Sequence, residues 1–218
     1  MPLFSLPRDY RTLTAAASLV IGPLVMAIGD LLHPRESMVP AEQIAIVMGD
    51  PSGWYLAHLL LFIGLMLFIP GLLALAGLAE ARRPAAGFVV RILILVGAAA
   101  FAAVFVGEML IGRYLLHGAE PGAATRLLET MFSGPLIAAV APAMLAFFAG
   151  TATFAFVLMR SGGGAGVAAA SILVGTLLVL AEIMTAQVVL SQIGNVLIFV
   201  GSASMAWLLL YRPPSTSR

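Results

Sequence analysis

Apolar residues fill six long stretches of the chain, and short polar or glycine-rich segments separate them. The stretches cover residues 13–32, 54–78, 88–111, 135–159, 167–185 and 193–211. Each is close to the roughly 20 residues that a helix needs to cross the hydrocarbon core of a bilayer. The runs are continuous and lack the two-residue alternation of barrel strands. We therefore predict an all-α fold, a polytopic membrane helix bundle with six transmembrane helices in one domain over residues 1–218.

The composition favours the same class of protein. Of the 218 residues, 61% are hydrophobic and 10% are charged, whereas soluble domains carry about 25% charged residues. The chain has no cysteine, which excludes disulfides and thiolate metal sites. Its net charge is +1, so nothing in the charge balance indicates a nucleic-acid partner.

Arginine is distributed unevenly over the segments between the apolar stretches. One side of the predicted bundle holds Arg8, Arg11, Arg82, Arg83, Arg91, Arg160, Arg212 and Arg218. The other side holds Arg35, Arg113 and Arg126. Cytoplasmic loops carry the excess of basic residues, so we expect both termini in the cytoplasm. Of the ten acidic residues, only Asp9 and Glu80 fall on the cytoplasmic side.

The two longer outer loops share a form. Each contains a segment that opens with proline, carries apolar residues at helical spacing and closes with glycine; these are Pro40–Gly49 and Pro121–Gly134. Proline suits the first turn of a helix and glycine the position after its end. We predict two short amphipathic helices at the outer interface. The residues expected to face inward are Ile44, Val47 and Met48, and Leu127, Leu128 and Met131. The helices would cover a polar site, or they would lie at the interface with no ligand beneath.

Four ionisable residues interrupt the apolar stretches: Asp30, His58, Glu108 and Glu182. Counted along their predicted helices, all four fall within one or two turns of the outer side. A charged group at the centre of a membrane helix costs roughly 2.5 to 3.5 kcal/mol on insertion scales. Four such costs at one depth predict a ligand-binding site on the extracytoplasmic side.

Carboxylate and imidazole groups bind protons, divalent metals and small polar ligands. His58, Glu108 and Glu182 form the best set for a divalent metal. A haem is a further possible cofactor, but it would need a second histidine at the same depth. Glu108 and His117 lie nine residues apart and face opposite sides of a continuous helix. The alternative interpretation is structural, with ion pairs between Glu108 and Arg113 or between Asp30 and His58.

Motifs of catalysis are missing from the sequence. It contains neither the H-E-x-x-H pattern of zinc hydrolases nor the G-x-S-x-G pattern of serine hydrolases. The leading hypothesis is therefore a membrane protein that binds a small ligand, a proton or a metal. Two alternatives remain: an accessory subunit of a larger membrane complex, and a small dimeric transporter. The expected partners are the lipid bilayer and either another membrane protein or a second copy of the chain.

The second apolar stretch carries a resemblance. Its sequence runs WYLAHLLLFIG over residues 54–64 and IPGLLALA over residues 69–76. This pattern resembles a segment of small, uncharacterised six-helix integral membrane proteins of high-GC bacteria. The resemblance covers about 25 residues. It implies a bacterial plasma membrane and transfers no functional residue.

Overall fold

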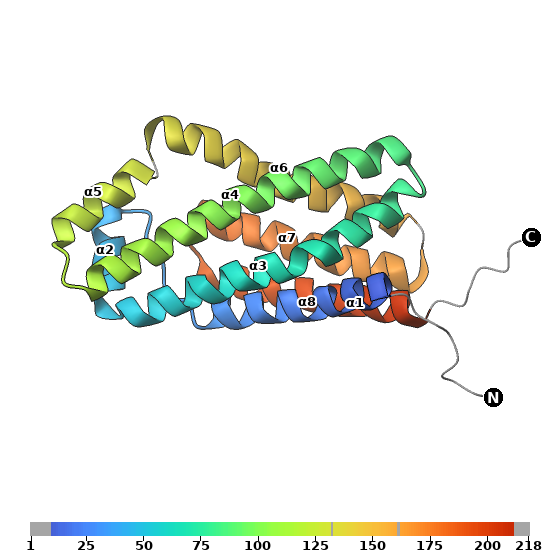
Figure 1. Cartoon of the computed structure of the whole chain (residues 1–218), viewed down its shortest axis with the longest axis horizontal. Helices are drawn as coiled ribbons and strands as arrows, with labels where there is room; N and C mark the ends of the chain where they lie inside the picture. Colours follow the sequence, from blue (N-terminus) through green and yellow to red (C-terminus); the bar gives the residue numbers. More distant parts are fainter. Residues whose placement is uncertain (1–9, 132, 161, 212–218) are drawn as a thin grey trace, which may run out of the picture.

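The computed structural model describes residues 10–131, 133–160 and 162–211, and these residues form eight α-helices and no strand (Figure 1). Six of the helices are long and apolar enough to cross a membrane: α1 (Tyr10–Leu31), α3 (Pro51–Glu80), α4 (Pro84–Leu116), α6 (Gly134–Met159), α7 (Gly163–Thr185) and α8 (Val188–Tyr211). The two loop helices are α2 (Pro40–Gly49) and α5 (Pro121–Met131). The prediction of an all-α bundle with six spanning helices and two short loop helices is confirmed.

Proline and capping residues set several helix starts. Proline stands in the first turn of α2, α3, α4 and α6, where its missing N–H costs no hydrogen bond. The Asp50 side chain caps α3 by accepting a hydrogen bond of 2.9 Å from the Gly53 backbone N–H. As a result, α3 begins at Pro51, three residues before the predicted stretch over residues 54–78.

Two other boundaries differ from the predicted ones. Helix α4 continues through Gly112 to Leu116, five residues beyond the apolar stretch. Helix α8 begins at Val188, because Ala186 adopts a left-handed backbone conformation with a φ of 53° and reverses the chain in one step. Most of residues 186–192, which separate two of the predicted stretches, therefore belong to α8.

The six long helices pack as a closed ring in the order α1, α3, α4, α6, α7, α8 and back to α1, and α3 also contacts α6 across the ring. Glycines permit the closest approaches. A Cβ on Gly22 of α1 would lie 2.6 Å from the Phe68 backbone of α3. A Cβ on Gly175 of α7 would lie 2.4 Å from the Gly194 carbonyl oxygen of α8. Lipid tails are as apolar as the helix surfaces, so the hydrophobic effect does not drive helices together in lipid. Close packing at small residues stabilises their association instead.

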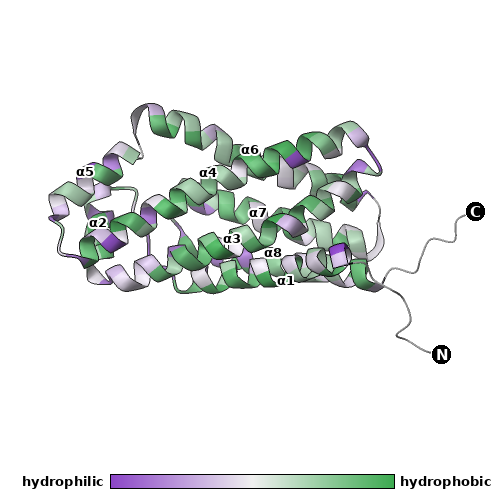
Figure 2. Cartoon of the chain, in the orientation of Figure 1, coloured by the Kyte–Doolittle hydropathy of each residue, from purple (hydrophilic) through white to green (hydrophobic). Residues whose placement is uncertain are grey.

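The two ends of the bundle differ in charge. At the end where α1 begins and α8 ends, which we call the basic end, lie Arg11, Arg82, Arg83, Arg91 and Arg160 together with Glu80. Arg8, Asp9, Arg212 and Arg218 lie outside the described residues. The opposite end, which we call the acidic end, carries α2 and α5 (Figure 1). Figure 2 shows that hydrophilic residues gather at the two ends while the long helices between them are mostly hydrophobic.

Helices α2 and α5 cover the acidic end and pack against each other and against α4. Their buried residues Ile44, Val47 and Leu128 form one cluster with Trp54 of α3. Met131 packs against this cluster as predicted. The predictions for Met48 and Leu127 are wrong, because these side chains are 48% and 40% exposed. The buried residues are Gln43, Ile44 and Val47 on α2 and Ala124 and Leu128 on α5.

Candidate functional site

Asp30, His58, Glu108 and Glu182 lie on four different helices, α1, α3, α4 and α7. Each is buried, with a side chain between 4% and 7% exposed. Each lies near the helix end that faces α2 and α5. The structure therefore places all four predicted residues in the acidic end, and the contacts between them run through residues that the sequence pattern did not single out.

His33 is the first of these additional residues. It follows the end of α1, and its Nε2 atom lies 3.3 Å from Nε2 of His58. The two rings meet at an angle of 64° with centroids 4.7 Å apart. The other nitrogen of each ring is held by a backbone carbonyl, that of Pro34 for His33 and that of Trp54 for His58. These carbonyls orient both rings so that their Nε2 atoms point at each other.

Trp54 connects the histidine pair to Glu108. Its side chain is 2% exposed, and its ring lies against both His33 and His58. The indole N–H donates a hydrogen bond of 3.1 Å to the backbone carbonyl of Glu108. Trp54 is therefore part of the cluster, although it lies close to the start of α3. The residue is buried between the histidines and the helices that cover them.

Asp30 is held by α8. Ser191 donates a hydrogen bond of 3.1 Å to one carboxyl oxygen of Asp30, and the Asn195 side chain is near the same carboxyl group. Gln192 donates to the Asp30 backbone carbonyl over 3.4 Å. These contacts fix the position of the carboxyl group where α1 and α8 meet.

Glu36 is the group that the other acidic residues share. It lies in the loop after α1, and its carboxylate lies 3.5 Å from Nε2 of His33. Its carboxyl group is near that of Glu182 and within electrostatic range of Asp30 and Glu108. Two carboxyl groups can hydrogen-bond to each other only when one of them carries a proton, because an ionised carboxylate only accepts.

The buried carboxyl groups have no basic partner in the described part of the chain. No arginine of residues 10–131, 133–160 and 162–211 forms an ion pair with Asp30, Glu108 or Glu182. The ion pairs between Glu108 and Arg113 and between Asp30 and His58, expected under the structural interpretation, are also missing from these residues. One oxygen of each carboxyl group, Oδ2 of Asp30, Oε2 of Glu108 and Oε1 of Glu182, is buried with no hydrogen-bond partner there.

A cavity of about 340 Å³ adjoins this cluster. It is lined by residues of the loop after α1 and of α2, among them Arg35, Glu36 and Glu42. The Glu36 side chain is 35% exposed, whereas that of His33 is 4% exposed. Glu36 therefore links the outer surface of the acidic end to the buried groups.

Geometry bears on the predicted cofactors. The separation of the two Nε2 atoms, 3.3 Å, is close to the spacing of two ligands on a tetrahedral zinc ion with bonds of about 2.05 Å. However, no group of three or more histidine, aspartate or glutamate side chains in the described residues is placed so that it would hold a metal ion. The set of His58, Glu108 and Glu182 thus stays a prediction. A haem does not fit between His33 and His58, because ring centroids 4.7 Å apart leave no space for the macrocycle.

Sequence patterns alone did not single out His33 and Glu36. Both lie in a loop outside the apolar stretches, so neither interrupts a hydrophobic run. A usable signal was the three-residue spacing from Asp30 to His33, which keeps the two residues at one helix end. Polar residues at the start of α8 also belong to the site, since Ser191 and Gln192 contact Asp30 there.

Comparison with known proteins gives no family for this chain, since no protein-family model, no curated protein and no solved structure matches it.

Proposed function

We propose that this multi-pass membrane protein binds protons in the cluster of carboxyl and imidazole groups at its acidic end. One observation carries the proposal. Three carboxyl groups from three helices are each more than nine-tenths buried, and each has an oxygen without a hydrogen-bond partner in the described part of the chain.

The physical reason is the cost of an unpaired charge. An ionised carboxylate without a counter-charge loses most of its hydration when it is buried, and a bound proton removes that cost. Arginine would also remove it, but no arginine pairs with these groups in the described residues. The His33–His58 pair places two ring nitrogens 3.3 Å apart, within reach of one proton, and the carboxyl groups of Glu36 and Glu182 are near each other.

Access to the cluster supports the same proposal. Glu36 faces the cavity on the outer side, lies beside His33 and is near Glu182. Toward the basic end, the buried side chains of the described residues are apolar, as in Leu19 and Leu72, or carry a hydroxyl group, as in Ser202, and none is ionisable. This arrangement favours proton exchange with one side of the membrane over a path through the protein.

The arginine distribution indicates which side of the membrane the cluster faces. With the basic end in the cytoplasm, both termini are cytoplasmic and the cluster exchanges protons with the extracytoplasmic side. The resemblance of residues 54–76 favours a bacterial plasma membrane. Within this proposal, a membrane-protein partner or a second copy of the chain would respond to the protonation state of the cluster.

Infrared spectroscopy tests the proposal directly. Difference spectra between acidic and neutral pH report the C=O stretching band of carboxyl groups that carry a proton. We expect bands from carboxyl groups shielded from water, and we expect the substitutions Glu108→Gln and Glu182→Gln each to remove one. Glu129→Gln is the matched control, because Glu129 is exposed on α5.

The outcomes separate the alternatives. Identical difference spectra for the wild type, Glu108→Gln and Glu182→Gln would overturn the proposal. Elemental analysis of the purified protein serves as the second measurement. A stoichiometric metal ion that is lost in both His33→Ala and His58→Ala would replace proton binding with metal binding.

A further inference from the structure

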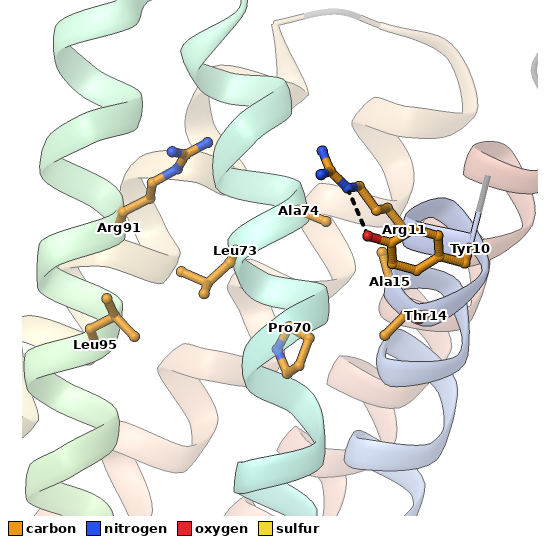
Figure 3. A pocket seen from close by; sticks show the side chains of 9 residues that line it. All are labelled: Tyr10, Arg11, Thr14, Ala15, Pro70, Leu73, Ala74, Arg91 and Leu95. Carbon is orange, nitrogen blue, oxygen red and sulfur yellow. Dashed lines mark hydrogen bonds between the residues drawn. The ribbon is translucent and has the colours of Figure 1, made fainter.

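A groove at the basic end carries an inference that is independent of the acidic cluster. Helices α1 and α4 both pack against α3 but do not contact each other in the described part of the chain. They leave a groove of about 480 Å³ over the exposed side of α3. Its wall is apolar along most of its length and includes Pro70 and Leu73 of α3 and Leu95 of α4 (Figure 3).

Two arginines stand at one end of this groove. Figure 3 shows the guanidinium groups of Arg11 on α1 and Arg91 on α4 at the same level, on either side of α3, with Pro70 and Leu95 farther along. Arg91 forms an ion pair of 2.7 Å with Glu80 through Nη2. Arg11 contacts the hydroxyl of Tyr10 through Nε over 3.5 Å. The remaining N–H groups of each guanidinium are available to an anion, because an arginine carries five donors.

We propose that the groove binds one anionic phospholipid. Its phosphate would lie between Arg11 and Arg91, and an acyl chain would lie along Pro70, Leu73 and Leu95. Charge complementarity supports this occupant, because the described residues of the basic end include five arginines and one acidic residue, Glu80. Arginine forks match the geometry of phosphate oxygens, and basic pockets between membrane helices bind anionic head groups.

The depth of the groove residues in the bilayer also supports an anionic phospholipid as the ligand. The arginines mark the level of the head groups, where long basic side chains end. The apolar wall lies on the bilayer side of this level, as an acyl chain requires. A soluble anion would be held by the arginines alone and would gain nothing from Leu73 or Leu95.

Native mass spectrometry of the full chain in detergent measures the binding of single lipids. We expect phosphatidylglycerol to bind about 25-fold more tightly than phosphatidylcholine with the same acyl chains, because two arginines contribute about fivefold each. Arg11→Gln and Arg91→Gln should each weaken phosphatidylglycerol about fivefold, the contribution typical of one arginine near an anionic lipid. The double variant should bind both lipids equally.

Two further variants make the test specific. Arg160→Gln removes an arginine of the same end that lies over the Phe156 ring, outside the groove, and it should leave the preference unchanged. Leu73→Trp fills the apolar wall and should weaken both lipids. Equal binding of the two lipids to the wild type would overturn the proposal. A loss in Arg160→Gln as large as that in Arg11→Gln would also overturn it, because surface charge alone would then explain the preference.

Discussion

At the scale of single residues, the buried carboxyl groups combine deep burial with incomplete hydrogen bonding. Asp30, Glu108 and Glu182 each retain a buried oxygen that no described residue satisfies. Most buried polar atoms in proteins are hydrogen-bonded, so each exception requires a physical reason. Proteins break this rule mainly at functional sites and compensate elsewhere in the fold.

The first prediction concerns the stability cost of these groups. Glu108→Gln and Glu182→Gln keep the size of the side chain and remove its charge, so we expect stability to stay the same or rise by about 1 kcal/mol. Ser18→Ala is the contrast, because Ser18 donates to the Leu67 carbonyl across the α1–α3 interface and its loss should cost about 1 kcal/mol. Reversible unfolding in mixed detergent measures both. A loss above about 2 kcal/mol in the glutamine variants would indicate a structural role instead.

The individual residues also show where sequence patterns stop being informative. Asp30, His58, Glu108 and Glu182 were predictable, because a polar residue in an apolar run is conspicuous. His33 and Glu36 were not, because they lie in a polar loop whose folding back onto α3 depends on tertiary contacts. The burial of Trp54 was not predictable either, because an aromatic residue near a helix end suits a membrane interface and a buried contact equally well.

At the scale of helices, contact between α1 and α3 depends on the absence of side chains at the crossing. We predict that Gly22→Ala destabilises the protein by about 1 to 3 kcal/mol, because the added methyl group meets the Phe68 backbone, which cannot move aside. Gly49→Ala is the matched control, since a Cβ there meets nothing within 4 Å. Unfolding of both variants in mixed detergent compares them. Equal stability of the two would show that α1 tilts freely away from α3.

The cover formed by α2 and α5 supplies the next prediction. Val47 is fully buried and its neighbour Met48 is 48% exposed, so Val47→Ser should loosen the cover and Met48→Ser should not. The chain has two tryptophans, and Trp207→Phe leaves only Trp54, which lies beneath the cover. In that background we expect acrylamide to quench Trp54 fluorescence more strongly in Val47→Ser than in Met48→Ser. Equal quenching would mean that α2 does not protect the cluster.

The helices themselves were predictable because a span in lipid must be long, apolar and helical. Their order around the ring was not predictable. A helix such as α6 is apolar on every side, so its sequence does not indicate which side faces lipid. Some helix boundaries were predicted wrongly for a related reason. Leu115, one of the residues that extend α4 to Leu116, packs against the buried cluster of α2, α5 and Trp54, a contact between segments distant in sequence.

At the scale of the whole molecule, the bundle is electrically asymmetric. Eight of its ten acidic residues belong to the acidic end or to the helix turns that lead to it, and five described arginines belong to the basic end. The two proposed sites follow this division. The proposed proton site lies where acids are concentrated, and the proposed lipid site lies where arginines are concentrated. The orientation of the bundle in the membrane decides which side each site faces.

The last prediction tests that orientation. Because the chain has no cysteine, single cysteines report on one position each. Met38 lies in the loop after α1 and is 62% exposed, and Ala85 is exposed in the first turn of α4. We expect a membrane-impermeant maleimide to label Met38→Cys in intact cells and to label Ala85→Cys only after the membrane is permeabilised, because basic ends remain in the cytoplasm. The reverse pattern would place the carboxyl cluster on the cytoplasmic side. Proton exchange would then respond to cytoplasmic pH, and the lipid groove would face the outer leaflet.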